Sequence, residues 1–163
     1  MPIILILLLA GASVFTPPNV QTEINYQVWK PFIKSFSEGN TDVFMGVHSK
    51  DLVRSGRESK RVLNWEDYYK ETKAGNENRV KNKTRLEIEL RFTERINSET
   101  QAIDVGVYKT SWFTADGKSG VGYGRFHVVM RKENGTWKIL VDTDSDEGRT
   151  IGETQFLAAR PME

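Results

Sequence analysis

The sequence contains no cysteine among its 163 residues. Disulfide bonds, zinc sites built on thiolates and catalytic cysteine nucleophiles are therefore excluded. A surplus of basic residues is also missing, because 23 Lys and Arg residues stand against 22 Asp and Glu residues and the formal net charge is +1. Proteins that bind nucleic acids through their phosphates usually have such a surplus or a basic stripe. We therefore expect no nucleic-acid partner.

A long apolar run occurs only at the N-terminus. Residues Ile3 to Ala10 are apolar, and Ala10-Gly11-Ala12 has the small-residue pattern that signal peptidase cleaves. Pro17-Pro18 ends the run well short of the roughly 20 residues that a membrane-spanning helix needs. We expect residues 1–12 to be a signal peptide, the mature protein to be exported (periplasmic or secreted), and no stable membrane anchor to remain after cleavage.

The rest of the chain has the composition of one soluble globular domain, with 38% apolar and 28% charged residues. No internal repeat and no linker interrupts it. We expect residues 13–22 to form a lead-in, residues 23–146 the folded domain, and residues 147–163 a C-terminal tail.

The first half of this domain has helical periodicity, and each predicted helix is bounded by a capping residue or a glycine. Three helices are predicted: Thr22 to Gly39, locally opened by Pro31; a short helix beginning at Thr41 or Asp42; and Asn64 to Gly75.

From Arg79 onward the apolar period changes from that of a helix to that of a strand. Four strands are predicted, at about residues 85–92, 102–114, 121–132 and 136–144. Asp116-Gly117 and Asn134-Gly135 are typical of two-residue hairpin turns. Helices followed by an antiparallel meander are typical of the α+β class.

Two such turns also assign the side chains of the strands to the two faces of the sheet. The face under the helices is predicted to hold Ile103, Val105, Val107, Phe126, Val128, Met130, Trp137, Ile139 and Val141. The opposite face is predicted to hold Asp104, Tyr108, Trp112, Tyr123, Arg125, His127, Val129, Leu140, Asp142 and Asp144. A shift of one residue in register would exchange the faces.

Two segments carry a resemblance to a known fold family. VWKPFIKSFSEGNTDVF at 28–44 and FHVVMRKENGTWKILVDTDS at 126–145 resemble the NTF2-like (cystatin-like) superfamily, and more closely its SnoaL-like and DUF4440-type members. The resemblance implies a cone in which helices pack on a curved antiparallel sheet, a pocket between them, and frequent homodimers through the outer sheet face. It implies no single activity, because the fold hosts isomerases, dehydratases, epoxide hydrolases and binding modules.

The catalytic positions of the steroid isomerase relatives are replaced in this chain. Alignment on Gly39-Asn40 puts Phe32 where those relatives have an oxyanion-binding tyrosine, and Ser55-Gly56 where they have the general-base aspartate. Thr143 stands where many DUF4440-type chains have a histidine. We expect no isomerisation by that mechanism, and we assign no catalytic residue.

Lys109 is the charged strand residue that the predicted register places on the inner face. Gly124 would lie beside it and Ser145 beyond, leaving space for a ligand whose anionic group meets Lys109; alternatively, Lys109 lies in water with its stem over the sheet. We expect a small anionic or amphipathic ligand, bound without catalysis and without a cofactor. The predicted ligand-binding residues are His48, Lys109, Gly124, Thr143, Ser145 and Trp29.

The two histidines offer an enzymatic alternative. His127 would lie opposite Asp142, where an outer-face pair favours a structural role. His48 lies where relatives line the pocket mouth. In a lyase, isomerase or hydrolase it would act with a helix-borne carboxylate: Asp42, Asp51 or Glu66. A third possibility is a purely structural homodimer module.

The acidic stretch 142–153 resembles a calcium loop. However, Gly148 stands at the seventh position instead of the sixth, and a strand precedes the loop where an EF-hand has a helix. A solvated acidic strand end is favoured, and we expect no metal site.

Overall fold

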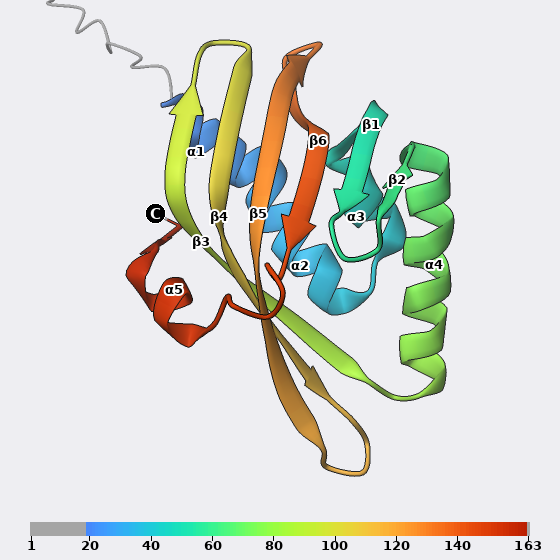
Figure 1. Ribbon diagram of the computed structural model, residues 1–163. Helices are drawn as coiled ribbons and strands as arrows, with labels where there is room; N and C mark the ends of the chain where they lie inside the picture. The colour runs from blue at the N-terminus through green and yellow to red at the C-terminus, as the bar shows by residue number, and fades with distance from the viewer. Residues whose placement is uncertain (1–18, 163) are drawn as a thin grey trace, which may run out of the picture.

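Most of the helices pack on one face of a curved, seven-stranded sheet in the computed structural model, which describes residues 19–162 (Figure 1). The strand order is β2-β1-β6-β5-β4-β3-β7, and the pairing is antiparallel except between β1 and β6. We call the face covered by the first three helices the inner face and the opposite one the outer face. The predicted α+β cone is confirmed.

The helices are α1 (Val20–Ile24), a π-helical segment (Asn25–Trp29), α2 (Lys30–Glu38), α3 (Thr41–Gly46), α4 (Trp65–Lys81) and α5 (Glu153–Ala158). The strands are β1 (His48–Gly56), β2 (Arg61–Leu63), β3 (Arg85–Asn97), β4 (Gln101–Phe113), β5 (Ser119–Glu133), β6 (Thr136–Ser145) and β7 (Arg160–Pro161).

The first predicted helix is observed as α1, the π-helical segment and α2 in succession. It begins earlier than predicted, because the side chain of Asn19 accepts a hydrogen bond from Gln21 N–H and caps the helix ahead of Thr22. The local opening predicted at Pro31 takes the form of a π-helical turn just before it, where the proline cannot donate to the helical ladder. Gly39 ends α2 in the left-handed conformation, with φ of 70°.

The helix α4 begins as predicted and ends later. Asn64 Oδ1 accepts a hydrogen bond from Asp67 N at 2.9 Å, which caps its first turn. The predicted stop at Gly75 is wrong, because this glycine is exposed and the helix continues to Lys81. Arg79 in the last turns donates to the carbonyls of Phe36 and Ser37 at 2.8 and 2.9 Å, which fixes the far end of α4 to the end of α2.

One of the two predicted hairpin turns is right and the other is wrong. Asn134-Gly135 is a two-residue turn, with Glu133 paired to Thr136. The Asp116-Gly117 turn is longer: Phe113 pairs with Ser119, and residues 114–118 form the loop. This shifts β4 by one residue and exchanges its faces. Asp104 and Tyr108 therefore lie on the inner face, whereas Ile103, Val105, Val107 and Lys109 lie on the outer face.

A bulge at Leu140 makes a second exchange. Met130 pairs with Ile139, as the turn predicts, but the next pair is Val129 with Val141, so Leu140 is an extra residue. Beyond the bulge, the alternate residues Asp142 and Asp144 face inward, and Thr143 and Ser145 face outward. His127 pairs with Thr143, so the predicted pair of His127 with Asp142 is wrong.

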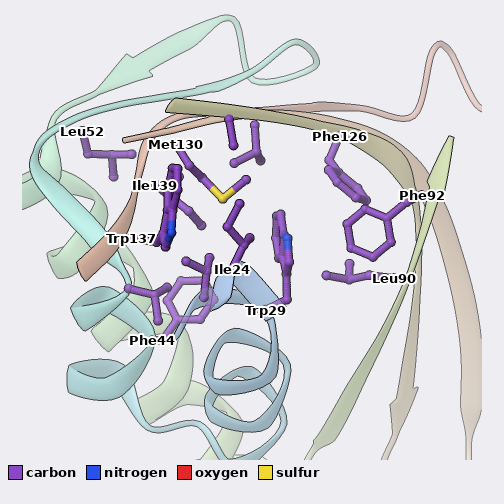
Figure 2. Close-up of a cluster of buried hydrophobic side chains, with 14 of the residues drawn as sticks. Ile24, Trp29, Phe44, Leu52, Leu90, Phe92, Phe126, Met130, Trp137 and Ile139 are labelled. Atoms are coloured by element: carbon purple, nitrogen blue, oxygen red, sulfur yellow. The ribbon is translucent and has the colours of Figure 1, made fainter. Parts of the chain in front are cut away.

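The core lies between the inner face and the first three helices (Figure 2). The Trp29 ring lies between the helix and the sheet, close to Phe92 and Phe126, with ring centroids 5.6 Å from each. Its indole N–H donates to the buried Asp104 carboxylate at 2.7 Å, and Arg95 donates to the same carboxylate. This buried carboxylate is paired and hydrogen-bonded, as a charge inside a protein must be.

The segment predicted as a C-terminal tail includes α5 and β7, which pack against the sheet. Phe156 and Ile151 form a small buried cluster with Val107 on the outer face. Strand β7 pairs with β3 at the sheet edge, Pro161 opposite Arg91. At the other end of the chain, the predicted signal peptide, residues 1–12, lies outside the described residues. Among residues 19–162, no helix is long and apolar enough to cross a membrane.

Candidate functional site

A cavity of about 230 Å³ lies between the inner face of the sheet and helices α2, α3 and α4. Most of its wall is apolar or aromatic, and its polar side chains come from β1, β4, β6 and α4. The apolar lining is Trp29, Phe32, Phe36, Phe44, Ile88, Leu90, Phe126, Val128 and Ile139. The polar lining is Arg54, Tyr68, Tyr108, Thr110, Asp142 and Asp144.

Asp142 is the most buried ionisable group in this wall, at 8% exposure. The parallel pairing of β1 with β6 sets Arg54 directly beside it, and Arg54 Nε lies 3.5 Å from Asp142 Oδ2. Burial opposes ionisation, but the neighbouring His48 ring and the Arg54 charge outweigh it, so the pKa of the Asp142 carboxyl lies below its usual value. Asp142 is therefore a carboxylate within a largely apolar cavity.

Asp144 lies one inward position further along β6. Its Oδ1 accepts from Arg54 Nη2 at 2.7 Å, and its Oδ2 accepts from the Tyr108 hydroxyl at 3.2 Å. Burial and the adjacent Asp144 charge raise the pKa of Tyr108 well above its usual value, so the phenol stays protonated and donates. Burial and the charge of Asp142 raise the pKa of Tyr68 in the same way.

Arg54 has little capacity left for a ligand. Its guanidinium joins both carboxylates, and its Nη1 donates to the carbonyls of Ser55 and Asp142 at 2.7 and 3.3 Å. Burial alone would lower its pKa, but the two carboxylates raise it above the usual value, so the group is permanently charged. One guanidinium facing two carboxylates leaves this end of the cavity negative unless His48 carries a proton.

The predicted ligand-binding residues are only partly brought together. Trp29 lines the cavity. His48 lies behind Asp142, its Nε2 3.7 Å from Oδ2, with its side chain fully buried. Gly124 is paired with Tyr108, whose ring fills the space where a β-carbon would stand. The open space predicted beside Gly124 is therefore occupied.

The other three predicted residues face away from the cavity. Lys109 lies on the outer face, 3.2 Å from Glu89, because of the shift in β4. The Thr143 hydroxyl donates to the carbonyl of His127 at 3.0 Å, and the Ser145 hydroxyl donates to Glu58 at 2.7 Å. The expectation that Lys109 holds an anionic group in the cavity is wrong.

The carboxylates proposed to work with His48 are also elsewhere. Asp42 accepts from the Tyr69 hydroxyl, Asp51 pairs with Arg131, and Glu66 is exposed. The carboxylate beside His48 is the strand-borne Asp142. The expectation that no strand residue but Lys109 brings a titratable group into the pocket is therefore wrong.

No group of three or more His, Asp or Glu side chains in the described part of the chain is arranged to hold a metal ion. Within the acidic stretch, Asp142 and Asp144 point into the cavity and are tied to Arg54. Asp146 instead accepts hydrogen bonds from the backbone N–H groups of Gly148 and Arg149 and shapes the loop after β6.

Comparisons with known proteins place the fold. The sequence matches no family model and no curated protein. An NTF2-like protein of unknown function from Shewanella oneidensis is similar in structure, with 20% identity, a TM-score of 0.57, and 77% of this chain and 98% of that one covered. An NTF2-like superfamily protein from Salmonella enterica has 14% identity, a TM-score of 0.62, and coverage of 77% and 89%.

A ketosteroid isomerase-like protein from Erwinia carotovora is also similar, at 12% identity and a TM-score of 0.59, with 77% of this chain and 94% of that one covered. At such identities the likeness concerns the fold alone. The prediction of an NTF2-like fold is confirmed, and the function must be argued from the cavity.

Proposed function

We propose that this chain, whose fold is NTF2-like, binds a compact amphipathic small molecule in the cavity under the sheet. The single observation that supports this most is the convergence of Asp142, Asp144 and Tyr108 at one end of an otherwise apolar wall. Ligand sites are commonly mostly apolar, with a few polar groups that orient the ligand. A buried carboxylate with one oxygen free has that orienting role.

The polar end favours a ligand that donates hydrogen bonds. The contacts of Asp142 with Arg54 and with His48 both involve Oδ2, and among the described residues Oδ1 has no hydrogen-bond donor. Arg54 is occupied by the two carboxylates and two carbonyls. A hydroxyl or amino group therefore fits this end better than the anionic group expected from the sequence, since a third anion would meet two carboxylates and no free cation.

The volume limits the ligand's size. A dry apolar cavity of about 150 Å³ accommodates benzene, so a cavity of about 230 Å³ suits one or two small rings or their aliphatic equivalent. The rings of Trp29, Phe32 and Phe126 offer faces and edges for such a body.

Three naphthalene derivatives test this proposal. 2-Naphthol carries a hydroxyl donor, 2-naphthoate an anion, and naphthalene neither. We expect calorimetric titration to show 2-naphthol binding more tightly than naphthalene, and 2-naphthoate binding more weakly than both. Asp142→Asn should remove the advantage of 2-naphthol. Tighter binding of 2-naphthoate would contradict the proposal. Native mass spectrometry of the purified protein would show any ligand retained from the cell.

A second candidate is an acid–base enzyme of the lyase, isomerase or hydrolase type. It is favoured by Asp142, an ionised carboxylate inside an apolar cavity, beside Asp144 and the protonated Tyr108 hydroxyl. A carboxylate could take a proton from carbon next to a carbonyl while a phenol donates to the oxygen. The residues would differ from those of the steroid isomerase relatives, because Phe32 replaces their tyrosine and Tyr108 of β4 would supply the phenol.

Solvent deuterium exchange distinguishes binding from catalysis. 2-Tetralone has the size of 2-naphthol and exchangeable protons beside its carbonyl. If the chain is an enzyme of this type, the protein should accelerate deuterium incorporation, as followed by proton NMR, and Asp142→Asn should abolish the acceleration. Binding of 2-naphthol without accelerated exchange would favour a binding protein.

We also propose that the chain forms a homodimer through the outer face. The aromatic residues that the sequence places on the outer face do not supply this contact, because Tyr108 and Trp112 face inward and Tyr123 packs against Phe156 of α5. An apolar row remains on this face, one residue from each of five neighbouring strands in direct pairing: Ile96, Ile103, Val129, Val141 and Val53. Ile96, Ile103 and Val53 are 57%, 44% and 44% exposed.

Export is a further proposal, and it rests on the sequence of residues 1–12 alone. The mass of the protein recovered from its native host tests it. We expect a mature chain that begins after Ala12, and recovery of the uncleaved chain would contradict export by a cleaved signal.

A further inference from the structure

The two ring nitrogens of His48 have different surroundings. Nδ1 lies 2.9 Å from the carbonyl oxygen of Phe44 in α3. A carbonyl oxygen can only accept, so Nδ1 carries a hydrogen. The neutral ring in this orientation has a bare lone pair on Nε2.

Among the described residues, Nε2 of His48 is the one buried side-chain nitrogen or oxygen without a hydrogen-bond partner. It faces Asp142 Oδ2 at 3.7 Å, and the His48 side chain is fully buried. A bare lone pair in this position would face a carboxylate oxygen, and two acceptors repel each other. A proton on Nε2 would convert the same contact into an ion pair.

Of the groups packed around His48, Asp142 is the charged one that contacts its ring. Helices α2, α3 and α4 contribute the rings of Phe32, Phe44 and Tyr68, with centroids 6.1, 5.2 and 5.6 Å from the imidazole. Tyr68 also brings a hydroxyl, which remains protonated at neutral pH. From β1, Arg54 reaches the same Asp142 oxygen from another side, and from β6, Asp144 is bound to Arg54.

We propose that His48 is a positioning residue that carries a second proton on Nε2, so that Asp142 Oδ2 is held between two cations and Oδ1 is left to the ligand. This inference rests on the proposed function in one respect, that the ligand is bound at Asp142. His48 itself does not line the cavity and is not expected to touch the ligand.

The protonation state of the site then controls ligand binding. When the imidazolium loses its Nε2 proton as the pH rises, Asp142 keeps only Arg54 as a counter-ion and faces a lone pair. The carboxylate is no longer fixed at Oδ2, and affinity for a hydroxyl ligand falls. The exposed His127 has no part in this, because it lies on the outer face and pairs with Thr143.

Nitrogen-15 NMR of the imidazoles tests the inference directly in the wild-type protein. The chain has two histidines, so the His127→Gln variant assigns both sets of signals. At pH 6 and without ligand, we expect protons on both nitrogens of His48, with the Nε2 proton lost on titration to alkaline pH. A ring that is neutral at pH 6, protonated only on Nδ1, would overturn the proposal.

Affinity for 2-naphthol provides the functional measurement. In His48→Gln, the amide can still donate toward Asp142 but carries no charge. We expect the affinity of this variant for 2-naphthol to be about tenfold lower than that of the wild type at pH 6, equivalent to one pKa unit of lost charge stabilisation. Between pH 6 and 8, its affinity should change much less than that of the wild type. His127→Gln should behave like the wild type. Unchanged affinity and an unchanged pH profile in His48→Gln would overturn the positioning role.

The NMR and affinity measurements distinguish a failure of the proposed ligand class from a failure of the proposed role of His48. If 2-naphthol does not bind the wild type although His48 is an imidazolium, the proposed ligand class is wrong and the protonation of His48 is supported. If 2-naphthol binds while His48 is neutral, the proposed function is supported and the role of His48 is overturned.

Discussion

Tyr108 and Gly124 are direct cross-strand partners on the inner face of the sheet, and the tyrosine ring lies in the space where a β-carbon on residue 124 would stand. The phenol can therefore lie across β5 and reach Asp144 with its hydroxyl. A glycine in a strand commonly marks such a close approach. The polar end of the cavity thus depends on residue 124 having no side chain.

Replacing Gly124 by alanine should displace this ring. We expect Gly124→Ala to destabilise the protein by about 1–3 kcal/mol, as overpacking of a core usually does, and to weaken 2-naphthol binding by disturbing Asp144. Urea denaturation and calorimetry measure the two effects. The control is Gly75→Ala, since a β-carbon there meets nothing within 4 Å. That change should stabilise α4 by about 0.5–1 kcal/mol. Similar stability of both variants would contradict the overlap with Tyr108.

Neutralising Asp142 should be costly at neutral pH. Asp142→Asn removes one partner of a buried ion pair and leaves Arg54 less compensated, so we expect a loss of about 3–5 kcal/mol in the free energy of unfolding. Asp116→Asn is a suitable control, because its pair with Lys118 lies in the exposed hairpin loop and should contribute little.

The difference in the free energy of unfolding between the wild type and Asp142→Asn should depend on pH, because folding lowers the pKa of Asp142. Its pKa in the folded protein lies below the unfolded value of about 4. The carboxylate therefore contributes stability above that unfolded value, and the contribution is lost as the pH falls through the folded-state pKa. Wild type and Asp142→Asn should converge in acid. A constant difference down to the lowest measurable pH would contradict this assignment.

The buried phenols should titrate late. Burial and nearby carboxylates raise the pKa of both Tyr68 and Tyr108. Because tyrosines in the unfolded chain ionise first, the two buried phenols contribute stability to the folded protein below about pH 10, and this stability is lost as the pH rises above that value. Ultraviolet absorbance should show these two tyrosines ionising only at a higher pH than a tyrosine in water, or on unfolding. Tyr108→Phe should remove one late transition; five tyrosines titrating together would exclude the buried environment.

A charge in the apolar row of the outer face should dissociate the proposed dimer. We expect Ile103→Lys to be a folded monomer in size-exclusion chromatography with light scattering, because a buried lysine at a dimer interface has no partner. Val80→Lys is the matched control, since Val80 is 80% exposed on α4, and it should leave the oligomeric state unchanged. A wild-type monomer would rule out the dimer itself.

The C-terminal helix should contribute to stability. Phe156 is 4% exposed and packs against Tyr123, with ring centroids 5.9 Å apart. Phe156→Ala should cost about 3 kcal/mol, at the lower end for a buried aromatic residue, whereas Leu157→Ala, at a 59% exposed position, should cost little. Thermal denaturation would show this as a lowered Tm for the first variant only. Equal effects would contradict the packing of α5 on the sheet.

The sequence was sufficient for the starts of the long helices and for the four long strands, because periodicity and capping are local properties. The four long strands, the cap at Asn64 and the end of α2 at Gly39 all follow from neighbouring residues. The extension of α4 past Gly75 was missed, because it depends on the distant contact of Arg79 with α2.

The candidate site was harder to predict because it depends on register. Lys109 and Tyr108 are neighbours in sequence, and a loop of five residues where two were expected decides which one faces the cavity. Alternation along the strand places Asp142 and Asp144 on the same face, but the bulge at Leu140 decides which face that is. Met130 and Ile139 lie next to the correctly predicted turn, and both are buried on the inner face as the turn predicts.

The bulge at Leu140 has an evolutionary consequence. If Leu140 paired with Val129 in a regular ladder, the end of β6 would rotate by half a period, turning both carboxylates outward and bringing Thr143 and Ser145 inward while leaving the buried Ile139 in place. The same residues can therefore line an acidic pocket or a pocket bearing hydroxyls, depending on whether the bulge forms. Substitutions that favour or disfavour the bulge, with no change in chain length, would be an economical route by which this chain exchanges one ligand chemistry for another.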